Sequence, residues 1–302
     1  MLSVIIPVFN EEDNLARLNA RIRESLSGIG EYEVFYVDDH STDSSYRMLK
    51  EFRKADPRVR IIRFKRNYGQ HAALAAGFDN CRGDYVVMMD ADLQNEPEDV
   101  PKIYQKMLEG HDYVSGWRKD RKDPFFSRKL PSKFINIMTS RFTGVKLHDY
   151  HCGLKGFSRE IVDQMKDFSE MRRCVPALAA KLCNNPTEVV VAHNERIGKS
   201  KYNLWGLARV YFDFYIGFSV RPFQFLAVAG AVLMALSVMV SMVYVAARLS
   251  GYIQPSPPFL YVMIFTGINS IQLIIFGVLG EYIMRIYRML QDKSLYKIEE
   301  TD

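Results

Sequence analysis

Two long apolar stretches late in the chain limit what it can fold into more than any other feature. Residues 222–247 are almost continuously apolar and uncharged, and residues 259–280 form a second apolar stretch after a short loop that contains prolines. A helix needs about 20 apolar residues to cross a bilayer. Because backbone groups in lipid must be satisfied within the segment, each stretch should be helical. We therefore expect a transmembrane hairpin with helices over residues 222–248 and 259–281.

The charges around these stretches predict their orientation. Basic residues flank the hairpin at Lys199, Lys201, Arg209, Arg221, Arg285, Arg288 and Lys293, whereas the loop has only Arg248 at its edge. Segments rich in Lys and Arg stay on the cytoplasmic side of a membrane. The opening MLSVIIPVFN lacks the basic flank of a signal peptide. We therefore expect a multi-pass protein of the inner (plasma) membrane with both termini, including a tail over residues 282–302, in the cytoplasm.

The first two thirds of the chain alternate short apolar runs with amphipathic ones. The apolar runs LSVIIPVF, EVFYVDD, VRIIRF, YVVMMDAD and DYVSGW are separated by runs with helical spacing. This βαβ rhythm predicts an α/β domain over residues 1–203, with a mostly parallel, doubly wound, Rossmann-like sheet. We expect the DYHCGLKGF segment to be irregular, followed by a helix near residues 177–183 and a strand in EVVVAHNER.

Residues 204–221, between this domain and the first apolar stretch, are rich in Trp, Tyr and Phe and sparse in charge. This composition predicts an interfacial juxtamembrane helix that lies on the membrane surface. A helix of a soluble core is the alternative.

Charge and cysteine content limit the classes of function that the chain could have. The 302 residues carry a formal net charge of +5, which suits anionic membrane surfaces and phosphorylated substrates. No signature of a nucleic-acid-binding module occurs, so we expect no nucleic-acid partner. The four cysteines are widely spread and form no CxxC pair. This argues against a disulfide framework and a structural zinc site, and it indicates reduced thiols in a cytosol.

Polar residues gather where the predicted strands end. PVFNEE, DDHSTD and DADLQN each follow an apolar strand, and parallel sheets bind ligands at the carboxyl ends of their strands. Asp90-Ala91-Asp92 is the strongest signal, because two carboxylates on a short turn can hold a divalent cation against a diphosphate. A pair of loop-capping aspartates is the alternative. Gln94 and the other acidic strand ends favour the metal.

Together these segments resemble the family 2 GT-A glycosyltransferases, and among them the polyprenyl-phosphate branch that includes dolichol-phosphate mannose synthases and bacterial enzymes with two spans. The resemblance runs along the whole chain and is closest to the undecaprenyl-phosphate 4-deoxy-4-formamido-L-arabinose transferase group. Its segments are PVFNEE from Pro7, VDDHSTD from Val37, RNYGQHAALAAGF from Arg66, DADLQNEPE from Asp90, DYHCGLKGF from Asp149, GKSKY from Gly198 and GEYIMRIY from Gly280.

This resemblance implies a GT-A fold and an inverting glycosyltransferase of the cytoplasmic membrane face. The donor would be a nucleotide sugar, with UDP favoured over GDP, and the acceptor would be polyprenyl (undecaprenyl) phosphate. The product would be a polyprenyl-monophosphate sugar for cell-envelope glycan or lipid modification. The resemblance also implies a homo-oligomer, specifically a tetramer.

The resemblance further assigns roles to residues. The nucleotide-sugar site would comprise Pro7, Phe9, Asn10, Glu11, Asp39, Asp90, Ala91, Ser200 and Lys201. Asp90, Asp92 and Gln94 would hold Mg²⁺ or Mn²⁺, with Asp92 as the principal ligand. In relatives an Arg usually stands three residues before Gly198, where this chain has Glu195. Arg196 is one residue out of place, so no role is carried over to it.

The acceptor phosphate would be met by Arg118, Arg128 and Ser132, because guanidinium forks donate bidentately to phosphate. A solvated helix face that touches anionic lipid is the alternative for Arg128. Asp149 is expected to orient the acceptor or serve as a base, and Asp92, Asp149 and Arg118 are the expected catalytic residues. A phosphate monoester is already an anion at neutral pH, so a general base adds little beyond positioning.

Two other functions are alternatives. A processive polysaccharide synthase would share the GT-A core, but it would be expected to have a QxxRW segment and more spans than this chain has. A non-catalytic membrane protein that binds nucleotide sugars, either a sensor or a flippase, would tolerate loss of the metal site. Asp90, Asp92 and Gln94 are all intact, which favours the enzyme.

Overall fold

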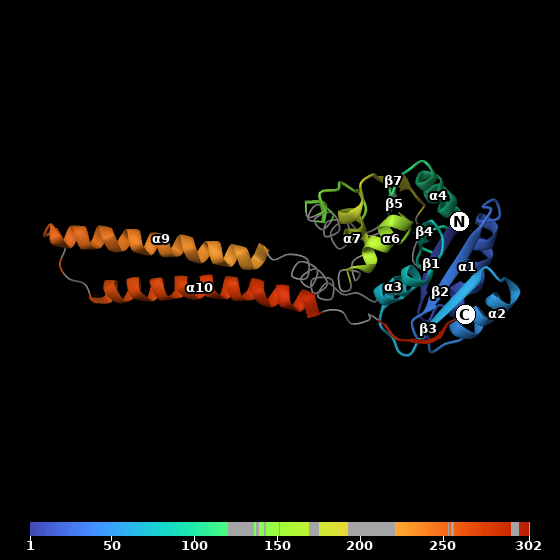
Figure 1. Ribbon diagram of the computed structural model, residues 1–302, viewed down its shortest axis with the longest axis horizontal. Helices are drawn as coiled ribbons and strands as arrows, with labels where there is room; N and C mark the ends of the chain where they lie inside the picture. Colours follow the sequence, from blue (N-terminus) through green and yellow to red (C-terminus); the bar gives the residue numbers. More distant parts are fainter. Residues whose placement is uncertain are drawn as a thin grey trace. The chain divides into compact units, whose positions relative to one another are not determined.

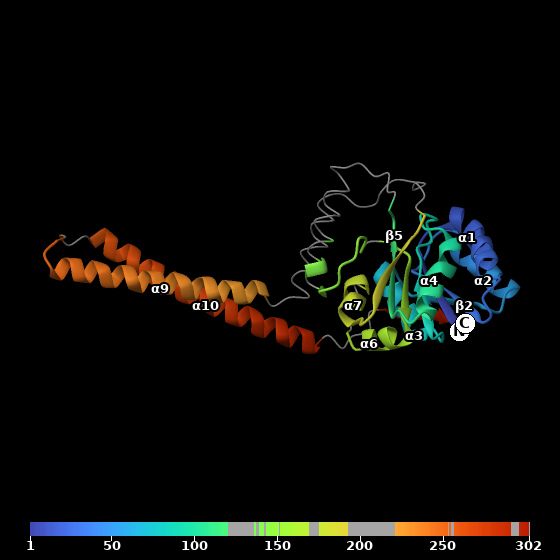
Figure 2. The same cartoon turned by 90° about the horizontal axis from the view of Figure 1, so that it is seen from above.

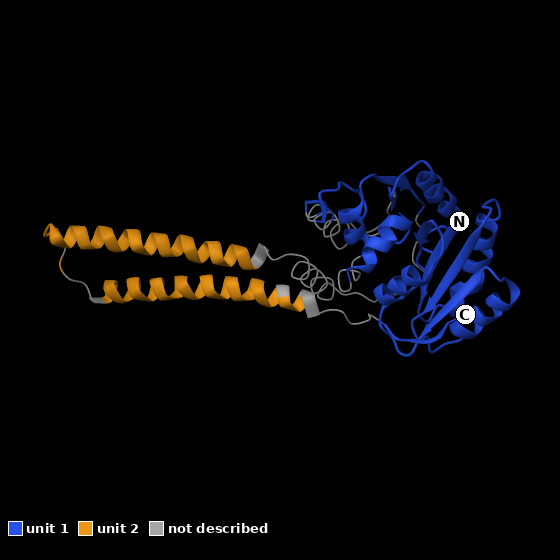
Figure 3. Ribbon diagram, in the orientation of Figure 1, with its two compact units in different colours: residues 1–201, 293–302 blue, residues 202–292 orange. Residues whose placement is uncertain are grey.

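The computed structural model describes residues 1–119, 136, 139–141, 143–150, 152–168, 175–192, 221–252, 254, 257–290 and 296–301. The chain divides into two compact units (Figure 3). The first comprises Met1–Lys201 together with Lys293–Asp302, and the second comprises Tyr202–Asp292. The sheet belongs to the first unit and the two long apolar helices belong to the second.

An eight-stranded sheet forms the frame of the first unit (Figure 1). Its strands are β1 (Leu2–Val8), β2 (Tyr32–Asp38), β3 (Val59–Phe64), β4 (Tyr85–Met88), β5 (Tyr113–Trp117), β6 (Lys155–Ser158), β7 (Pro186–Val190) and β8 (Ile298–Thr301). Their order across the sheet is β7-β5-β6-β4-β1-β2-β3-β8. The pairs β1–β2, β1–β4, β2–β3 and β5–β7 are parallel, whereas β6 and β8 are antiparallel to their neighbours. The predicted mostly parallel sheet is confirmed.

Helices cover both faces of this sheet (Figure 2). They are α1 (Glu12–Ser25), α2 (Ser45–Ala55), α3 (Gln70–Asn80), α4 (Val100–Leu108) with the short 3-10 turn η1 (Pro97–Asp99) before it, α6 (Arg159–Lys166) and α7 (Val175–Leu182). Successive strand side chains point to opposite faces. Val4 and Ile6 therefore pack with α1, α2 and α4, while Ile5 packs with α3, α6 and α7. Two cores explain why the central strands are continuous apolar runs.

Two strands were not expected from the sequence. The DYHCGLKGF segment was predicted to be irregular, but Lys155–Ser158 is β6 and pairs with both β4 and β5. Ile298–Thr301, in the expected tail, is β8 and pairs with β3 at the edge of the sheet. Each strand has only four residues and shows no apolar run. Short strands of mixed polarity carry little periodic signal, so they appear only when the sheet order is known.

The second unit contains α9 (Arg221–Leu249) and α10 (Pro257–Leu290). Phe223–Leu249 and Pro258–Met284 have mean hydropathies of 2.4 and 2.0. In the most apolar 18-residue stretch of each, only 6% and 11% of the residues are buried. A core helix of a soluble protein would bury its apolar side chains. Both helices are therefore long, apolar and exposed enough to cross a membrane. Residues 204–220, where the interfacial helix is predicted, lie outside the described residues.

Small residues let α9 and α10 pack closely. A Cβ added to Gly277 of α10 would lie 2.6 Å from the carbonyl oxygen of Phe223 and 2.7 Å from the backbone nitrogen of Ala227. A Cβ added to Gly230 of α9 would lie 2.8 Å from the carbonyl oxygen of Ser270. Close backbone approach of this kind is how helices associate in lipid, where tails compete for every apolar contact.

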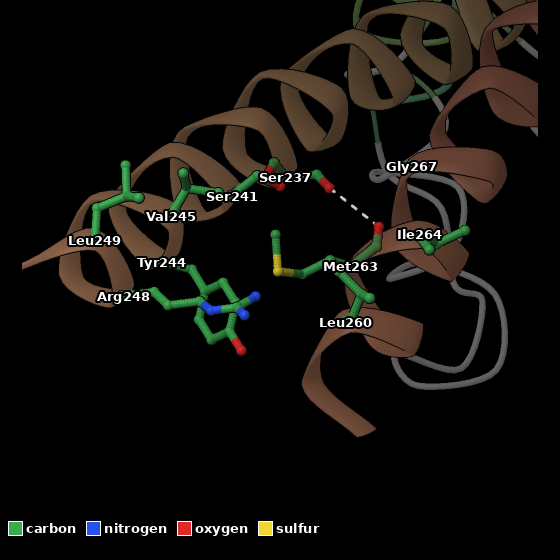
Figure 4. A pocket seen from close by; sticks show the side chains of 10 residues that line it. All are labelled: Ser237, Ser241, Tyr244, Val245, Arg248, Leu249, Leu260, Met263, Ile264 and Gly267. Atoms are coloured by element: carbon green, nitrogen blue, oxygen red, sulfur yellow. Dashed lines mark hydrogen bonds between the residues drawn. The ribbon is translucent and has the colours of Figure 1, made fainter. Parts of the chain in front are cut away.

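Nearer the connecting loop, the same two helices leave a cavity of about 720 Å³ between them (Figure 4). Apolar side chains form most of its lining, with Ser237, Ser241, Tyr244 and Arg248 from α9. Ser237 Oγ donates across the helix pair to the carbonyl oxygen of Met263 at 3.4 Å. None of the predicted site residues lines this cavity.

Candidate functional site

Four loops at the carboxyl ends of strands each contain a residue with a left-handed backbone conformation, that is, a positive φ. These residues are Asn10 after β1 (φ 53°), His40 after β2 (φ 63°), Gly69 after β3 (φ 92°) and Leu93 after β4 (φ 57°). Glycine adopts this region readily, but a leucine there is strained. Strained backbone gathers at functional sites. The same edge of a parallel sheet is where ligands bind, so these loops form the candidate active site.

Asn10 joins the loop after β1 to the loop after β2. Its backbone N–H donates to Ser41 Oγ at 3.0 Å, and its Oδ1 accepts from the Thr42 N–H at 2.8 Å. The Glu11 N–H donates to Ser45 Oγ, at the start of α2, at 2.9 Å. The first predicted nucleotide-site segment therefore has a fixed conformation at the ligand-binding edge. Its other two predicted residues are Pro7, which is buried, and Phe9, which is half-buried.

Asp39 fixes the loop after β3. The residue is 3% exposed, and its two carboxylate oxygens accept the N–H groups of Tyr68 at 2.7 Å and Gly69 at 2.8 Å. Burial raises the pKa of Asp39, and the two N–H donors oppose this effect. Each carboxylate oxygen has two lone pairs. Asp39 can therefore hold this loop and still accept a hydrogen bond from a nucleotide.

Asp90 and Asp92 lie on the turn after β4, with Ala91 buried between them. Gln70 Nε2 donates to Asp90 Oδ1 at 2.6 Å, and the Gln94 N–H donates to Asp92 Oδ1 at 3.2 Å. Burial, together with the nearby Asp92 carboxylate, raises the pKa of Asp90 to about 6. A divalent cation would relieve this repulsion. Two hard carboxylate donors suit Mg²⁺ or Mn²⁺, so these residues fit the predicted metal.

A cation at Asp90 and Asp92 would need ligands beyond these two carboxylates. Among the described residues, no group of three or more His, Cys, Asp or Glu side chains could hold a metal ion. Gln94 contacts Asp92 through its backbone N–H. A metal held by Asp90 and Asp92 would have coordination positions left for water or a diphosphate.

Gly153 packs directly against the Asp90 carboxylate. A Cβ at this position would collide with Asp90 Oδ2, and it would lie 2.8 Å from Asn95 Nδ2. Only glycine leaves the carboxylate its place. The DYHCGLKGF segment is thus brought against the turn that carries the two aspartates.

Arg118 and Asp149, two of the predicted catalytic residues, form an ion pair. Arg118 Nε lies 2.6 Å from Asp149 Oδ2, and the guanidinium makes a second bond of 3.0 Å to Oδ1. The two side chains are 9% and 4% exposed. A bidentate pair this well buried holds both groups in one orientation. The structure therefore shows Arg118 bonded to Asp149, and its expected contact with the acceptor phosphate stays a prediction.

Four other predicted site residues, namely Arg128, Ser132, Ser200 and Lys201, lie outside the described residues. Arg196 lies outside them as well.

Two contacts in the site were not foreseen. Lys155 of β6 is completely buried, and its Nζ donates to Ser115 Oγ at 2.6 Å. Ser115 Oγ in turn lies 3.2 Å from the carbonyl oxygen of Asp149, to which it donates. Burial lowers the pKa of Lys155. The second contact is the bond from Gln70 to Asp90. Both contacts depend on tertiary structure, although a lysine within an otherwise apolar GLKGF run was a visible sign.

The chain is similar to known glycosyltransferases. Residues 3–166 match the family described as glycosyl transferase family 2. The chain is 36% identical to an undecaprenyl-phosphate 4-deoxy-4-formamido-L-arabinose transferase of Pseudomonas fluorescens, over 99% of this chain and 89% of the relative. It is 37% identical to the transferase of the same name from Klebsiella pneumoniae, over 99% and 92%.

Among solved structures, one similar chain is a mannosyltransferase from Pyrobaculum calidifontis in complex with GDP-mannose and Mn²⁺. The TM-score is 0.51, the identity is 16%, and the match covers 97% of this chain and 88% of that one. At this identity the likeness concerns the fold alone.

Proposed function

The chain belongs to glycosyl transferase family 2, and from this premise we propose that it transfers a sugar from a UDP-sugar to undecaprenyl phosphate. One observation carries the proposal: relatives named as undecaprenyl-phosphate sugar transferases match 99% of the chain. The match therefore includes both the GT-A sheet and the two apolar helices. A soluble glycosyltransferase would need only the sheet.

The donor would bind at the edge formed by the loops after β1, β2 and β4. Asn10 and Glu11 shape the first loop, and Asp39 would accept a hydrogen bond from the base or ribose. Ser200 and Lys201 are proposed to close over the diphosphate, on the strength of the family resemblance. Residues with a left-handed backbone conformation lie at these strand ends. Such conformations persist only where the surrounding structure fixes them, which supports a preorganised site.

Asp90 and Asp92 would hold Mg²⁺ or Mn²⁺, with Asp92 as the principal ligand. The bound cation would neutralise charge on the departing nucleoside diphosphate. Gln70 and Gly153 keep Asp90 in place, one by a hydrogen bond and the other by leaving space. The protein's own contribution is thus to hold two carboxylates close together at the strand end, at a cost that is visible in the raised pKa of Asp90.

The reaction needs positioning more than proton transfer. An oxygen of the acceptor phosphate would attack the anomeric carbon, and the bond from that carbon to the diphosphate would break in line, with inversion. The attacking oxygen is already anionic, so no base is required. Asp149 instead orients Arg118, to which it is bonded twice. Arg128, Ser132 and Arg118 are proposed to contact the acceptor phosphate.

The acceptor's apolar chain would remain in the bilayer, because each exposed CH₂ group costs about 0.8 kcal/mol. Helices α9 and α10 would hold the enzyme at the same membrane. The segments before α9 and after α10 belong to one compact unit. If both helices cross the membrane, both ends of the hairpin would lie on one side of it, and the basic flanks favour the cytoplasmic side. This supports a cytoplasmic catalytic unit.

Identification of the lipid product tests the proposal. Purified protein is incubated with undecaprenyl phosphate, Mn²⁺ and a panel of UDP- and GDP-sugars that includes UDP-4-deoxy-4-formamido-L-arabinose, and the lipids are analysed by mass spectrometry. One sugar on a monophosphate is the expected product. A polymer would indicate the processive synthase instead. Absence of any product, with nucleotide sugar bound, would indicate a non-catalytic binding protein.

Asp92→Asn is the variant that tests the metal assignment. Transfer should fall by a factor on the order of 100 or more, because the variant loses a charged ligand of a cation that stabilises the leaving group. Asp163→Asn is the matched control, since Asp163 is a half-exposed acid on α6. EDTA should silence the wild-type enzyme, and either Mn²⁺ or Mg²⁺ should restore it. Turnover of Asp92→Asn equal to that of the control would contradict the assignment.

A further inference from the structure

The last strand of the chain runs beside β3 up to the loop that leads into the donor site. In the β3–β8 pair, Arg63 lies opposite Glu300, and the Lys65 N–H donates to the carbonyl oxygen of Lys297 at 3.1 Å. Lys65 is the first residue after β3. The backbone of this final segment therefore fixes the start of the loop over residues 65–69.

A chain of aromatic rings continues this contact. Tyr296 stacks on Phe64, with centroids 5.1 Å apart and planes 15° apart, and its hydroxyl donates to Asp79 Oδ2 at 2.7 Å. Phe64 is completely buried and meets Tyr68 edge-on, with centroids 5.6 Å apart. Stacked and edge-on pairs are both favourable arrangements. Phe64 thus links a ring from the end of the chain to a ring in the loop.

Tyr68 connects the Phe64 ring to Asp39. The backbone N–H groups of Tyr68 and Gly69 donate to the two carboxylate oxygens of Asp39, while residues 65–67 are exposed. The fixed points of the loop therefore include the Lys297 carbonyl at its start, the Phe64 ring in its middle and Asp39 at its end. The first of these comes from the segment after α10, and the second stacks on Tyr296 of that segment.

Arg63 also connects β8 to the residue before Asp39. Arg63 Nε lies 3.4 Å from Asp38 Oδ2 and 3.4 Å from Glu299 Oε2. Asp38 is fully buried and immediately precedes Asp39. The final strand therefore places a carboxylate on the same arginine that faces the buried acid beside the donor site.

We propose that Tyr296 is a positioning residue of the donor site, which holds the loop over residues 65–69 so that Asp39 keeps its place against the nucleotide. The inference rests on the proposed function, because Asp39 is assigned to the donor there. Helix α10 ends at Leu290 and β8 begins at Ile298. The segment that completes the donor site thus follows the second apolar helix in the sequence, which gives a function to a strand so distant in the chain from its neighbours.

Binding of UDP in the presence of Mn²⁺, measured by calorimetry on the full-length protein in detergent, tests the proposal. Tyr296→Ala removes the ring and should weaken UDP binding about three- to tenfold, the effect of losing one aromatic pair. Tyr296→Phe is the matched control, since it keeps the ring and loses only the bond to Asp79. It should bind UDP as the wild type does. The KM for undecaprenyl phosphate should be unchanged in both variants. Wild-type UDP affinity in Tyr296→Ala would overturn the proposal.

Hydrogen exchange distinguishes a local effect from a general loss of stability. In Tyr296→Ala, the amides of residues 65–70 should exchange faster while those of β1 stay protected. Faster exchange in both regions would overturn the positioning role. If Tyr296→Ala does not fold, Tyr296→Leu fills the space without a flat ring and is judged by the same two measurements. A wild-type protein that binds neither UDP nor GDP would refute the proposed function, whereas exchange at residues 65–70 would still decide whether Tyr296 holds the loop.

Discussion

Gly153 shows how one small residue determines the place of a metal-binding carboxylate. A Cβ at position 153 would overlap Asp90 Oδ2, so Gly153→Ala should push the Asp90 carboxylate out of place. Displacement of a reacting group by about 1 Å costs on the order of 100-fold in rate. We expect a loss of that size in kcat/KM, measured with the lipid-product assay. Gly28→Ala is the control, because a Cβ there would meet nothing within 4 Å. Equal activities of the two variants would contradict the tight packing.

The pKa of Asp90 predicts how metal use depends on pH. Burial and Asp92 raise the pKa to about 6 from its ordinary value of 3.8, so below about pH 6 a proton competes with the cation. The Mn²⁺ concentration for half-maximal activity should rise about tenfold per pH unit below that point, and stay nearly constant above it. Initial rates in Mn²⁺ titrations between about pH 5 and 8 measure this. A requirement for Mn²⁺ that is flat across that range would contradict it.

The same shift has a defined sign for stability. The folded protein binds the Asp90 proton more readily than the unfolded chain does. Its contribution to metal-free stability is therefore lost as the pH rises from about 4 through 6. Bound Mn²⁺ should offset this loss, so the rise in Tm caused by Mn²⁺ should be larger at pH 7 than at pH 5.

Part of this site could be predicted from residue types alone. Asp90 and Asp92 were predictable because two acids end an apolar strand. Lys155 was not, because its burial beneath Asp149 depends on β6 lying between β4 and β5. Arg118 and Asp149 were predicted separately, but no sequence pattern showed that they bond to each other across 31 positions.

At the scale of elements, the parallel strands were predictable because burial on both faces makes them apolar throughout, as in β1 and β2. The edge strand β8, with the sequence IEET, has one apolar residue. A strand at a sheet edge faces solvent and needs little apolar area, and polar residues there discourage pairing with other chains. The features that suit β8 to its place are thus the ones that concealed it in the sequence.

The packing of α9 on α10 gives a prediction for these two elements. Gly277→Leu would place its side chain against the backbone of α9 at Phe223 and Ala227, so it should separate the helices. We expect a lower Tm in detergent, by several degrees, as overpacking costs about 1–3 kcal/mol. Gly267→Leu on the same helix is the control, because a Cβ there would meet nothing within 4 Å. A Tm for Gly277→Leu equal to that of the control would show that the contact contributes little.

At the scale of the whole molecule, the chain leaves its first unit before α9 and returns to it after α10. Strand β8 bonds to β3, so the segment that follows α10 is part of the same sheet as the segment that precedes α9. Two crossings return a chain to the side from which it started. Two independent observations thus support the topology we propose, with both ends of the hairpin in the cytoplasm: the shared sheet and the distribution of Lys and Arg.

Reporter fusions test this topology, and the shared sheet makes the prediction stricter than charge bias alone. A reporter inserted at Gln254, between α9 and α10, should report the outside of the membrane, and reporters at residues 1 and 302 should both report the cytoplasm. Glu299→Lys with Glu300→Lys provides a further check: it should loosen β8 from Arg63 and Lys50 without reversing the hairpin, because added positive charge keeps that end in the cytoplasm. A cytoplasmic reading at Gln254 would mean that α9 and α10 do not cross the membrane. The acceptor would then have to be met by a protein that only rests on the bilayer, and the role assigned to the hairpin would be wrong even if the transfer reaction were confirmed.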